Sequence, residues 1–384
     1  MALAAVFVCA SVVFGAKAVS AKAYALIDQS SGRLIEGANT DERLPMASTT
    51  KIMTGLLACE SGKLDETVTV TGSEIRIEGS SMGLQVGECL TIRELTYGLL
   101  LESGNDAANV IAIKLDGSVP AFVDRMNARA SKLGLTGTHY ANSCGLDAPG
   151  HYTTAFDLAR LGAAAMNNPE FAKIVGTQKI KIPYAGVANG RTLFNHNRLL
   201  STFSGMLGIK TGFTEKDGRC LVTCARRDGV TLVAATLKDP DDWDDHKKLL
   251  ESGFSLLKQR RLLDGPLSIS EKVVGGTSGS VAADYDADVS AALADGELEK
   301  VNMTVDLPEF IYAPVNKGRK LGELVFTVDG QTVARTPLTA AETVRQRRPG
   351  AVKYGAGAAV ITAAAALAAF AIYRKLKEKK ESGT

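Results

Sequence analysis

Three short motifs, separated by long stretches of chain, constrain the fold more than any other feature of this sequence. They are Ser48-Thr49-Thr50-Lys51, Ser103-Gly104-Asn105 and Lys210-Thr211-Gly212, in that order. Together they supply a nucleophile, a base, a proton relay and an anion-binding cation, the set of groups that serine acyl transfer requires. A fold that uses them must therefore bring three distant parts of the chain to one site.

Each motif taken alone is weak evidence. A Ser-x-x-Lys pattern is more often a solvated helical turn, Ser-Gly-Asn is more often a plain turn, and Lys-Thr-Gly is usually the end of a strand. A second Ser-x-x-Lys pattern occurs at Ser255–Lys258, but no Ser-x-Asn or Lys-Thr-Gly follows it. We interpret that copy as an ordinary helical stretch. Only the joint order of the three motifs favours catalysis.

The first motif predicts an activated serine. Spacing of three residues places Ser48 and Lys51 on one face of a helix, close enough to exchange a proton. The apolar residues 52–58 continue that helix into a core. At the helix N-terminus, the dipole and the free backbone N–H groups favour a developing oxyanion. Lys51 acts as a base only when neutral, so burial and a nearby cation should lower its pKa, and Lys210 is the candidate cation.

The third motif is predicted to lie on a strand beside the cleft. Residues 220–225 and 230–237 have the pattern of two strands, and the Asp-Gly pair in Arg226–Gly229 is a strong hairpin signal. From such a strand Lys210 can hold a substrate carboxylate, and Gly212 allows the substrate backbone to approach closely.

The second motif is predicted to form a short polar loop. Ser103 and Asn105 follow the mostly apolar residues 95–101. A polar loop at that place can pass protons and hold a substrate amide.

With Pro45-Met46-Ala47 before the first motif and Phe213-Thr214 after the last, the chain resembles the low-molecular-mass penicillin-binding proteins, and more narrowly the serine D-alanyl-D-alanine carboxypeptidases. The resemblance runs from about residue 22 to about residue 344, and it includes the stretches 23–28, 142–147 and 151–158. It implies an α+β fold, in which a penicillin-binding/β-lactamase-like catalytic domain has an antiparallel sheet flanked by helices. A small C-terminal β-sandwich domain is expected to follow.

The resemblance also implies the residues of the site. They are catalytic Ser48, Lys51 and Ser103, and substrate-binding Asn105, Lys210, Thr211, Gly212 and Phe213. Ser48 would form the acyl-enzyme with Lys51 as its general base, and Ser103 would relay protons. Asn105 would orient the peptide, while Lys210 with Thr211 would bind the terminal carboxylate.

The reaction implied is removal of the last D-alanine from a peptidoglycan pentapeptide stem, through an acyl-enzyme that water hydrolyses. The backbone N–H groups of Ser48 and Phe213 would form the oxyanion hole. β-Lactam antibiotics would act as covalent inhibitors. No metal or organic cofactor is expected.

Two positions depart from the family pattern. Asp217 stands where the family often has a small residue, so its charge either weakens carboxylate binding or faces solvent. Cys144 stands where a small or polar residue is expected, and the sequence assigns it no role.

Composition agrees with an enzyme of this kind. A chain of 384 residues suggests two domains plus tails, and its formal net charge of +2 gives no indication of nucleic-acid binding. The six cysteines show no metal-ligand pairing and are interpreted as buried free thiols: Cys9, Cys59, Cys89, Cys144, Cys220 and Cys224. The four histidines predict neither a zinc site nor a Ser/His/Asp triad: His139, His151, His196 and His246.

The two ends predict export and membrane attachment. Residues 1–21 have the pattern of a signal peptide with a cleavage site at Val19-Ser20-Ala21, although no basic residue precedes the apolar run. Residues 354–373 carry no charge, have a tyrosine at each edge and are followed by a basic tail at 374–384. We therefore expect a transmembrane anchor, with the catalytic domain outside the cytoplasm. The alternative is an alanine-rich soluble helix.

Between the ends the chain is expected to divide into a catalytic domain at 22–260, a β domain at 261–345 and a linker at 346–353. In the first, Thr154-Ala155-Phe156-Asp157 predicts a capping box that opens a helix over 158–166. In the second, residues 301–305, 323–328 and 331–335 alternate as strands do, with a turn at Asp329-Gly330. A spacer between the active site and the membrane is the simplest role for the β domain.

Two other functions stay open. A β-lactamase of the same fold would need an acid that activates water. Glu170 is the only glutamate between the second motif and the third, and its setting, Asn167-Asn168-Pro169-Glu170, is typical of a turn that ends a helix. A non-catalytic cell-wall scaffold is the other alternative. It would have no need of the intact Ser48, Lys51, Ser103 and Lys210.

Overall fold

The computed structural model describes residues 19–184, 190–263 and 265–347. These residues form two compact units. The larger unit contains the described residues up to Pro266 together with Asp286–Asp306 and Glu323–Pro337. The smaller unit contains Leu267–Tyr285, Leu307–Gly322 and the described residues from Leu338 onward.

A five-stranded antiparallel sheet lies at the centre of the catalytic part of the larger unit. Its strand order is β2-β1-β9-β8-β7, with bounds β1 (Ala23–Asp28), β2 (Leu34–Ala38), β7 (Met206–Thr214), β8 (Gly218–Arg227) and β9 (Val230–Leu237). All neighbouring strands run antiparallel. The antiparallel sheet predicted from the sequence is confirmed, and the strand that carries the third motif, β7, is at one edge of it.

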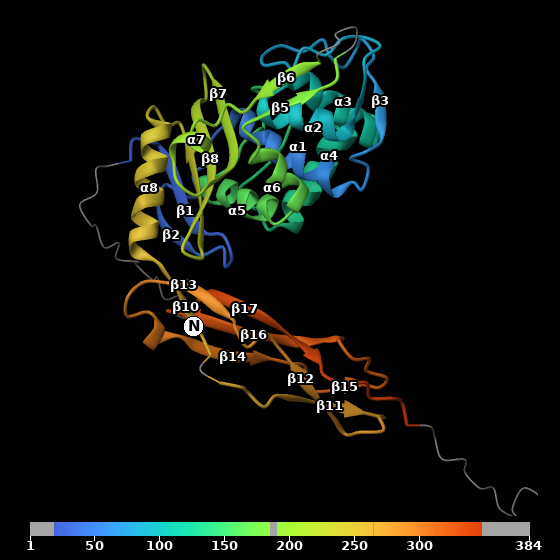
Figure 1. Ribbon diagram of the computed structural model, residues 1–384, viewed down its shortest axis with the longest axis vertical. Helices are drawn as coiled ribbons and strands as arrows, with labels where there is room; N and C mark the ends of the chain where they lie inside the picture. The colour runs from blue at the N-terminus through green and yellow to red at the C-terminus, as the bar shows by residue number, and fades with distance from the viewer. Residues whose placement is uncertain (1–18, 185–189, 264, 348–384) are drawn as a thin grey trace, which may run out of the picture. The chain divides into compact units, whose positions relative to one another are not determined.

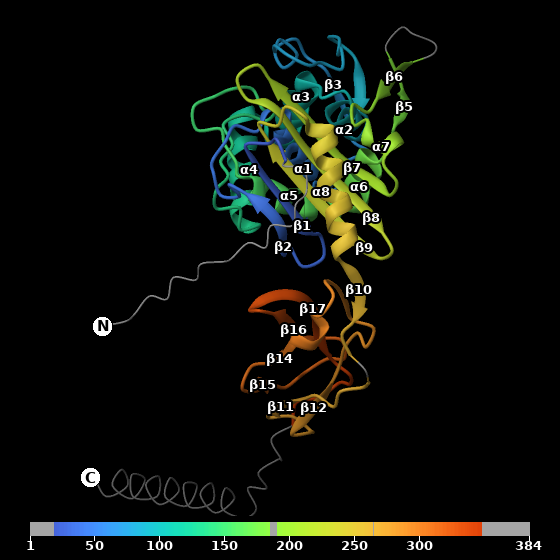
Figure 2. The ribbon, with the colours of Figure 1, turned by 90° about the vertical axis from the view of Figure 1, so that its left-hand side faces the viewer.

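Helices cover both faces of this sheet. On one face α8 (Asp242–Leu256) packs against β8 and β9, and on the other α5 (Ala155–Met166) packs against β1 and β9 (Figures 1 and 2). Gly162 of α5 permits close packing, because a Cβ there would lie 3.0–3.2 Å from side chains of β7, β8 and β9. With both faces covered, seven of the eight residues of β9 are buried.

Most of the other helices form a group on the α5 side of the sheet (Figure 1). They are α1 (Lys51–Glu60), α2 (Ile92–Leu101), α3 (Asn105–Asp116), α4 (Val119–Lys132) and α6 (Pro169–Val175). The short α7 (Leu199–Thr202) packs against β7, and its Leu199 belongs to the core that α8 covers. Helix α1 is buried over Lys51–Ala58, as expected for a helix that is apolar on all sides. A core of this kind fixes the position of the first motif.

Two small hairpins accompany these helices. One joins β3 (Thr67–Thr69) to β4 (Cys89–Thr91), and the other joins β5 (Lys179–Ile182) to β6 (Arg191–Phe194). The residues between β3 and β4 return to the neighbourhood of the second motif and matter for the site.

The predicted turn between β8 and β9 is confirmed. Asp228 has φ +47° and Gly229 has φ +84°, the positive pair that a tight two-residue hairpin turn requires.

The predicted capping box at Thr154 is wrong in one of its two bonds. Thr154 Oγ1 does accept from the backbone N–H of Asp157. The Asp157 carboxylate instead accepts from Gly137 N at 2.7 Å and from Thr138 Oγ1 at 2.9 Å, so it fastens a neighbouring loop. The helix α5 consequently begins at Ala155 and not at residue 158.

The strands after α8 also follow the predicted pattern. In the larger unit β10 (Lys258–Arg261) pairs with β13 (Ser290–Leu293), and β14 (Asn302–Asp306) pairs with β16 (Lys320–Val328). In the smaller unit β11 (Ser270–Val274) pairs with β12 (Ser280–Asp284) and with β15 (Ile311–Tyr312), and β12 pairs with the end of β17 (Gln331–Ala340). The turn at Asp329-Gly330 is present, with φ +48° and +79°.

The second Ser-x-x-Lys pattern is not wholly helical. Ser255 lies near the end of α8, whereas Lys258 begins β10 and forms an ion pair with Asp295. The two side chains therefore do not share a helix face.

Among the described residues, no helix is both long enough and apolar enough to cross a membrane. The predicted anchor at 354–373 and most of the predicted signal peptide lie outside the described residues, so both stay predictions.

Candidate active site

The nucleophile and the base of the first motif are in contact. Ser48 lies in a 3₁₀ turn, Ala47–Thr50, and Lys51 is the first residue of α1. Lys51 Nζ donates to Ser48 Oγ at 2.8 Å. The expected proximity is observed, although a 3₁₀ turn and not α1 itself carries the serine.

Lys51 is fully buried, and this changes its basicity. Burial lowers the pKa of Lys51 from 10.5 to about 8, and the Asp106 carboxylate opposes the shift. A second hydrogen bond, from Nζ to the carbonyl oxygen of Cys144 at 2.6 Å, holds the amine in place. At pH 7 about one tenth of the molecules then carry a neutral Lys51, able to accept the Ser48 proton.

The loop that contains Cys144 is a part of the site to which the sequence assigned no role. A Cβ at Gly145 (φ +94°) would lie 2.0 Å from the carbonyl oxygen of Ala47, so this loop packs directly on the nucleophile turn. It is the backbone of Cys144 that contacts Lys51. The side chain is a buried thiol whose pKa burial raises.

Lys210 lies near Lys51, and both amines are buried. Burial first, and the Lys51 charge second, lower the pKa of Lys210 well below its ordinary value. The less basic of two neighbouring amines loses its proton first, and a neutral amine exerts no charge on the other. Burial is the largest cause of the lowered pKa of Lys51, and a contribution from the charge of Lys210 stays a prediction.

The second motif joins the end of α2 to the start of α3. Ser103 adopts φ +61°, an unusual backbone conformation for a residue with a side chain, and Asn105 begins α3. The Asn105 backbone N–H donates to the carbonyl oxygen of Ser80 at 2.8 Å. Its Nδ2 donates to the carbonyl oxygen of Glu78 at 2.7 Å.

A cleft of about 450 Å³ brings the three motifs together. Five predicted site residues line it directly: Ser48, Ser103, Thr211, Gly212 and Phe213. Lys51, Asn105 and Lys210 are almost fully buried beside it. Sequence reasoning missed seven further lining residues, which belong to none of the motifs: Ser80, Asn195, His196, Arg198, Arg219, Asp242 and Trp243.

Gly212 shows how closely β7 approaches the nucleophile. A Cβ at this position would lie 3.1 Å from Thr49 N and 3.2 Å from Ser48 N. The end of β7 therefore runs along the turn whose N–H groups are candidates for the oxyanion hole. The Phe213 side chain is 62% exposed, which leaves its backbone to serve the site.

Asp217 does not face solvent, in contrast to the simpler of the two expectations. It is 2% exposed, and burial first and a hydrogen bond with Asp147 second raise its pKa to about 6. It is therefore still mostly ionised at pH 7 and loses its charge as the pH falls through about 6.

Glu170 is placed unfavourably for the water activation that a β-lactamase needs. It lies in the first turn of α6, capped by Asn168, and forms an ion pair with Arg93. It is not among the residues that line the cleft.

The described cysteines are all free, but they are not all buried. Cys144, Cys220 and Cys224 are buried, Cys59 is partly buried and Cys89 is exposed. Among the described residues, no cluster of three or more His, Cys, Asp or Glu side chains suits a metal ion.

Comparison with known proteins places this site in a family. The sequence pattern of the D-alanyl-D-alanine carboxypeptidases matches residues 10–241. The chain belongs to this family. Residues 267–346 match the C-terminal domain of penicillin-binding protein 5.

Individual relatives agree along most of the chain. The D-alanyl-D-alanine carboxypeptidase DacF of Bacillus subtilis is 31% identical over 341 residues, which cover 85% of this chain and 86% of the relative. DacC of Escherichia coli is 32% identical over 354 residues, which cover 86% of each. Penicillin-binding protein 5 of Haemophilus influenzae superposes with a TM-score of 0.68 at 27% identity, covering 87% of this chain and 100% of the other. The predicted family, the penicillin-binding fold of the catalytic domain and the class of serine-type carboxypeptidase are confirmed.

Proposed function

We propose that this D-alanyl-D-alanine carboxypeptidase works through Ser48, with Lys51 as its base, on the pentapeptide stems of peptidoglycan. The observation that carries the assignment is the 2.8 Å contact between Lys51 Nζ and Ser48 Oγ at a lysine whose pKa burial lowers to about 8. A lysine with that pKa is both an adequate acceptor and an adequate donor near neutral pH.

In the first half-reaction, neutral Lys51 takes the Ser48 proton as Oγ attacks the carbonyl carbon of the penultimate D-alanine. The backbone N–H groups of Ser48 and Phe213 stabilise the oxyanion. As the C–N bond breaks, Ser103 passes a proton from Lys51 to the departing D-alanine nitrogen. In the second half-reaction Lys51 takes a proton from water, which attacks the ester carbonyl carbon, and Lys51 returns that proton to Ser48 Oγ as the ester C–O bond breaks.

Lys210 and Thr211 bind the carboxylate of the terminal D-alanine. Burial favours the neutral form of Lys210 in the empty cleft. An arriving carboxylate offers the partner that a buried ammonium needs, so substrate binding draws a proton onto Lys210. The site thereby favours substrates that end in a free carboxylate.

The proposal is tested by D-alanine release from a diacyl-L-lysyl-D-alanyl-D-alanine peptide. The full chain in detergent should release one D-alanine per peptide, and Ser48→Ala should release none. Equal release by both proteins would remove Ser48 from the mechanism. Rapid turnover of penicillin with no release from the peptide would favour a β-lactamase instead.

We also propose that residues 354–373 anchor the protein in the cell membrane, with the catalytic domain outside the cytoplasm. The uncharged run, its flanking tyrosines and the basic tail support this placement. Full-length protein should sediment with membranes and resist extraction by high salt, and a chain that ends at Gly350 should not. A full-length protein that high salt releases would argue for surface attachment.

A further inference from the structure

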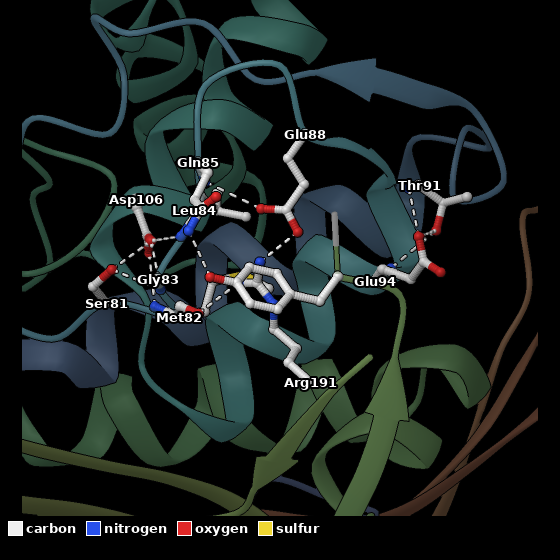
Figure 3. Close-up of polar contacts among 11 residues, drawn as sticks. Ser81, Met82, Gly83, Leu84, Gln85, Glu88, Thr91, Glu94, Asp106 and Arg191 are labelled. Carbon is white, nitrogen blue, oxygen red and sulfur yellow. Dashed lines mark hydrogen bonds and ion pairs between the residues drawn. The ribbon is translucent and has the colours of Figure 1, made fainter. Parts of the chain in front are cut away.

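A loop that contributes one residue to the active-site cleft is organised by a buried carboxylate (Figure 3). We call residues 78–85, between β3 and β4, the cleft loop. Ser80 of this loop lines the cleft together with Ser48 and Ser103. The carboxylate that holds the loop belongs to Asp106, the residue directly after the second motif.

Asp106 receives four hydrogen bonds from the cleft loop. Its Oδ1 accepts from Met82 N at 3.0 Å. Its Oδ2 accepts from Ser81 Oγ at 2.5 Å and from the backbone N–H groups of Gly83 and Leu84, each at 3.1 Å. Three successive backbone N–H groups thus converge on one side chain.

Burial makes this arrangement demanding. Asp106 is 1% exposed, and a buried carboxylate is tolerated only when donors surround it. Its Oδ1 also accepts from Ala107 N at 2.9 Å, which ties the carboxylate to the first turn of α3. The loop cannot move away without leaving a buried charge without its donors, so it is fixed relative to α3.

The cleft loop in turn fixes Asn105. The carbonyl oxygens of Ser80 and Glu78 accept from Asn105 N and from Asn105 Nδ2, respectively. Because a carbonyl oxygen can only accept, the Asn105 amide must turn its nitrogen toward Glu78 and its oxygen elsewhere. The residue between the two carbonyls is Gly79, with φ +85°, where a Cβ would lie 2.8 Å from Asn105 Nδ2.

The far side of the loop has its own support. Arg191 of β6 donates to the carbonyl oxygen of Met82 at 2.6 Å and forms an ion pair with buried Glu88 (Figure 3). Glu88 also accepts from Gln85 N at 3.1 Å. These bonds support the loop at Met82 and Gln85, while Asp106 and Asn105 connect it to the second motif.

We propose that Asp106 is a positioning residue for the carboxypeptidase reaction, acting through the cleft loop on the orientation of the Asn105 amide. The inference rests on the role proposed for Asn105 in binding the peptide. Asp106 does not touch the reacting atoms. It determines which hydrogen-bonding groups Asn105 offers to the substrate.

The test is a double-mutant cycle between Asp106→Asn and Asn105→Ala in the full chain. The readouts are kcat/KM for D-alanine release and the rate of Ser48 acylation by penicillin. An asparagine at 106 places an NH₂ group against N–H donors, so we expect kcat/KM to fall on the order of 10²-fold, the usual cost of a displacement of about 1 Å. In the Asn105→Ala background the same change should cost less than about 3-fold, because the two residues act through one contact.

Glu94→Gln is the matched control (Figure 3). The Glu94 carboxylate also accepts from a backbone N–H and a hydroxyl, those of Thr91, in the capping box of α2, but it has no link to the cleft. This variant should lower the melting temperature and leave kcat/KM within about 2-fold. If Asp106→Asn fails to fold, Gly79→Ala tests the same link from the loop side, and it should likewise lose activity only while Asn105 is present.

Three results would overturn the proposal. They are additive losses in the cycle, an Asp106→Asn protein with wild-type kcat/KM, and an Asn105→Ala protein with wild-type kcat/KM. If Ser48→Ala abolishes release in the same assay, these results refute only the role of Asp106 and leave the proposed function standing. If Ser48→Ala releases D-alanine normally, the proposed function itself fails.

Discussion

The pH dependence of acylation offers the sharpest check of how Lys51 is activated. Burial lowers its pKa from 10.5 to about 8, and only the neutral amine accepts the Ser48 proton. At pH 7 the neutral fraction is about 9%, compared with about 0.03% for an unshifted lysine. The shift therefore contributes a factor of about 300 in active base at pH 7, or about 3.4 kcal/mol of transition-state free energy.

The expected rate profile follows from those fractions. The second-order rate constant for acylation by penicillin should rise about 10-fold from pH 6 to pH 7. It should rise about 10-fold again from pH 7 to pH 9 and level off there. The rate is measured by quenching the reaction at short times and quantifying acylated protein by intact-protein mass spectrometry. The rate is measured only between pH 6 and pH 9, where the carboxylate of penicillin stays ionised.

A second arm tests the electrostatic cause through the midpoint of the profile, which is independent of how far the substitution lowers the rate itself. The Asp106 carboxylate raises the pKa of Lys51, so Asp106→Asn should move the midpoint of the profile to lower pH. The proposed role of Lys51 is refuted if the rate is flat between pH 6 and 9, or if it still rises about 10-fold from pH 8 to pH 9. The first result would mean that Lys51 is not the base, and the second that its pKa is not lowered.

Three further predictions concern other residues. Lys210→Ala should lower kcat/KM about 10²-fold for a peptide with a free C-terminal carboxylate and leave kcat/KM for the C-terminal amide of that peptide nearly unchanged. A loss of equal size on both substrates would contradict the role of Lys210 in binding the carboxylate. Glu170→Gln should hydrolyse the penicilloyl-enzyme at the wild-type rate within about 2-fold, because Glu170 is paired with Arg93; a drop beyond about 10-fold would revive the β-lactamase alternative. Burial lowers the pKa of His246 to about 3. Below about pH 6.5 the unfolded chain therefore binds a proton at this residue, whereas the native protein does not. As the pH drops, His246 should lower the free energy of unfolding by up to about 1.4 kcal/mol per pH unit. Urea unfolding of His246→Asn between pH 6.5 and 4 should show a shallower decline than that of the exposed-site control His139→Asn, and identical slopes would refute the assignment.

Features set by neighbouring residues were predictable from the sequence. The Asp228-Gly229 turn requires two positive φ angles, which those residue types supply. The contact of Ser48 with Lys51 needs only three residues of helical backbone. The motif order then sufficed to indicate one cleft.

Features set by distant contacts were not predictable. Ser80 reaches the cleft because Asp106, 26 residues away, gathers its loop, and no local pattern marks that pairing. Asp217 is buried and interacts with Asp147, which lies in another loop distant in the sequence. The direction of the influence between Lys51 and Lys210 depends on which amine is the less basic, and that follows from burial in the folded chain.

The most direct test of the central claim is to locate the acyl group after reaction with penicillin. Full-length protein is quenched, digested and analysed by tandem mass spectrometry, with Ser48→Ala treated in parallel. We expect the peptide that contains Ser48 to gain the mass of one intact penicillin, and fragment ions to place the added group on Ser48. The Ser48→Ala protein should carry no adduct. An adduct on another serine, or an equal adduct in Ser48→Ala, would contradict the assignment of Ser48 as the nucleophile.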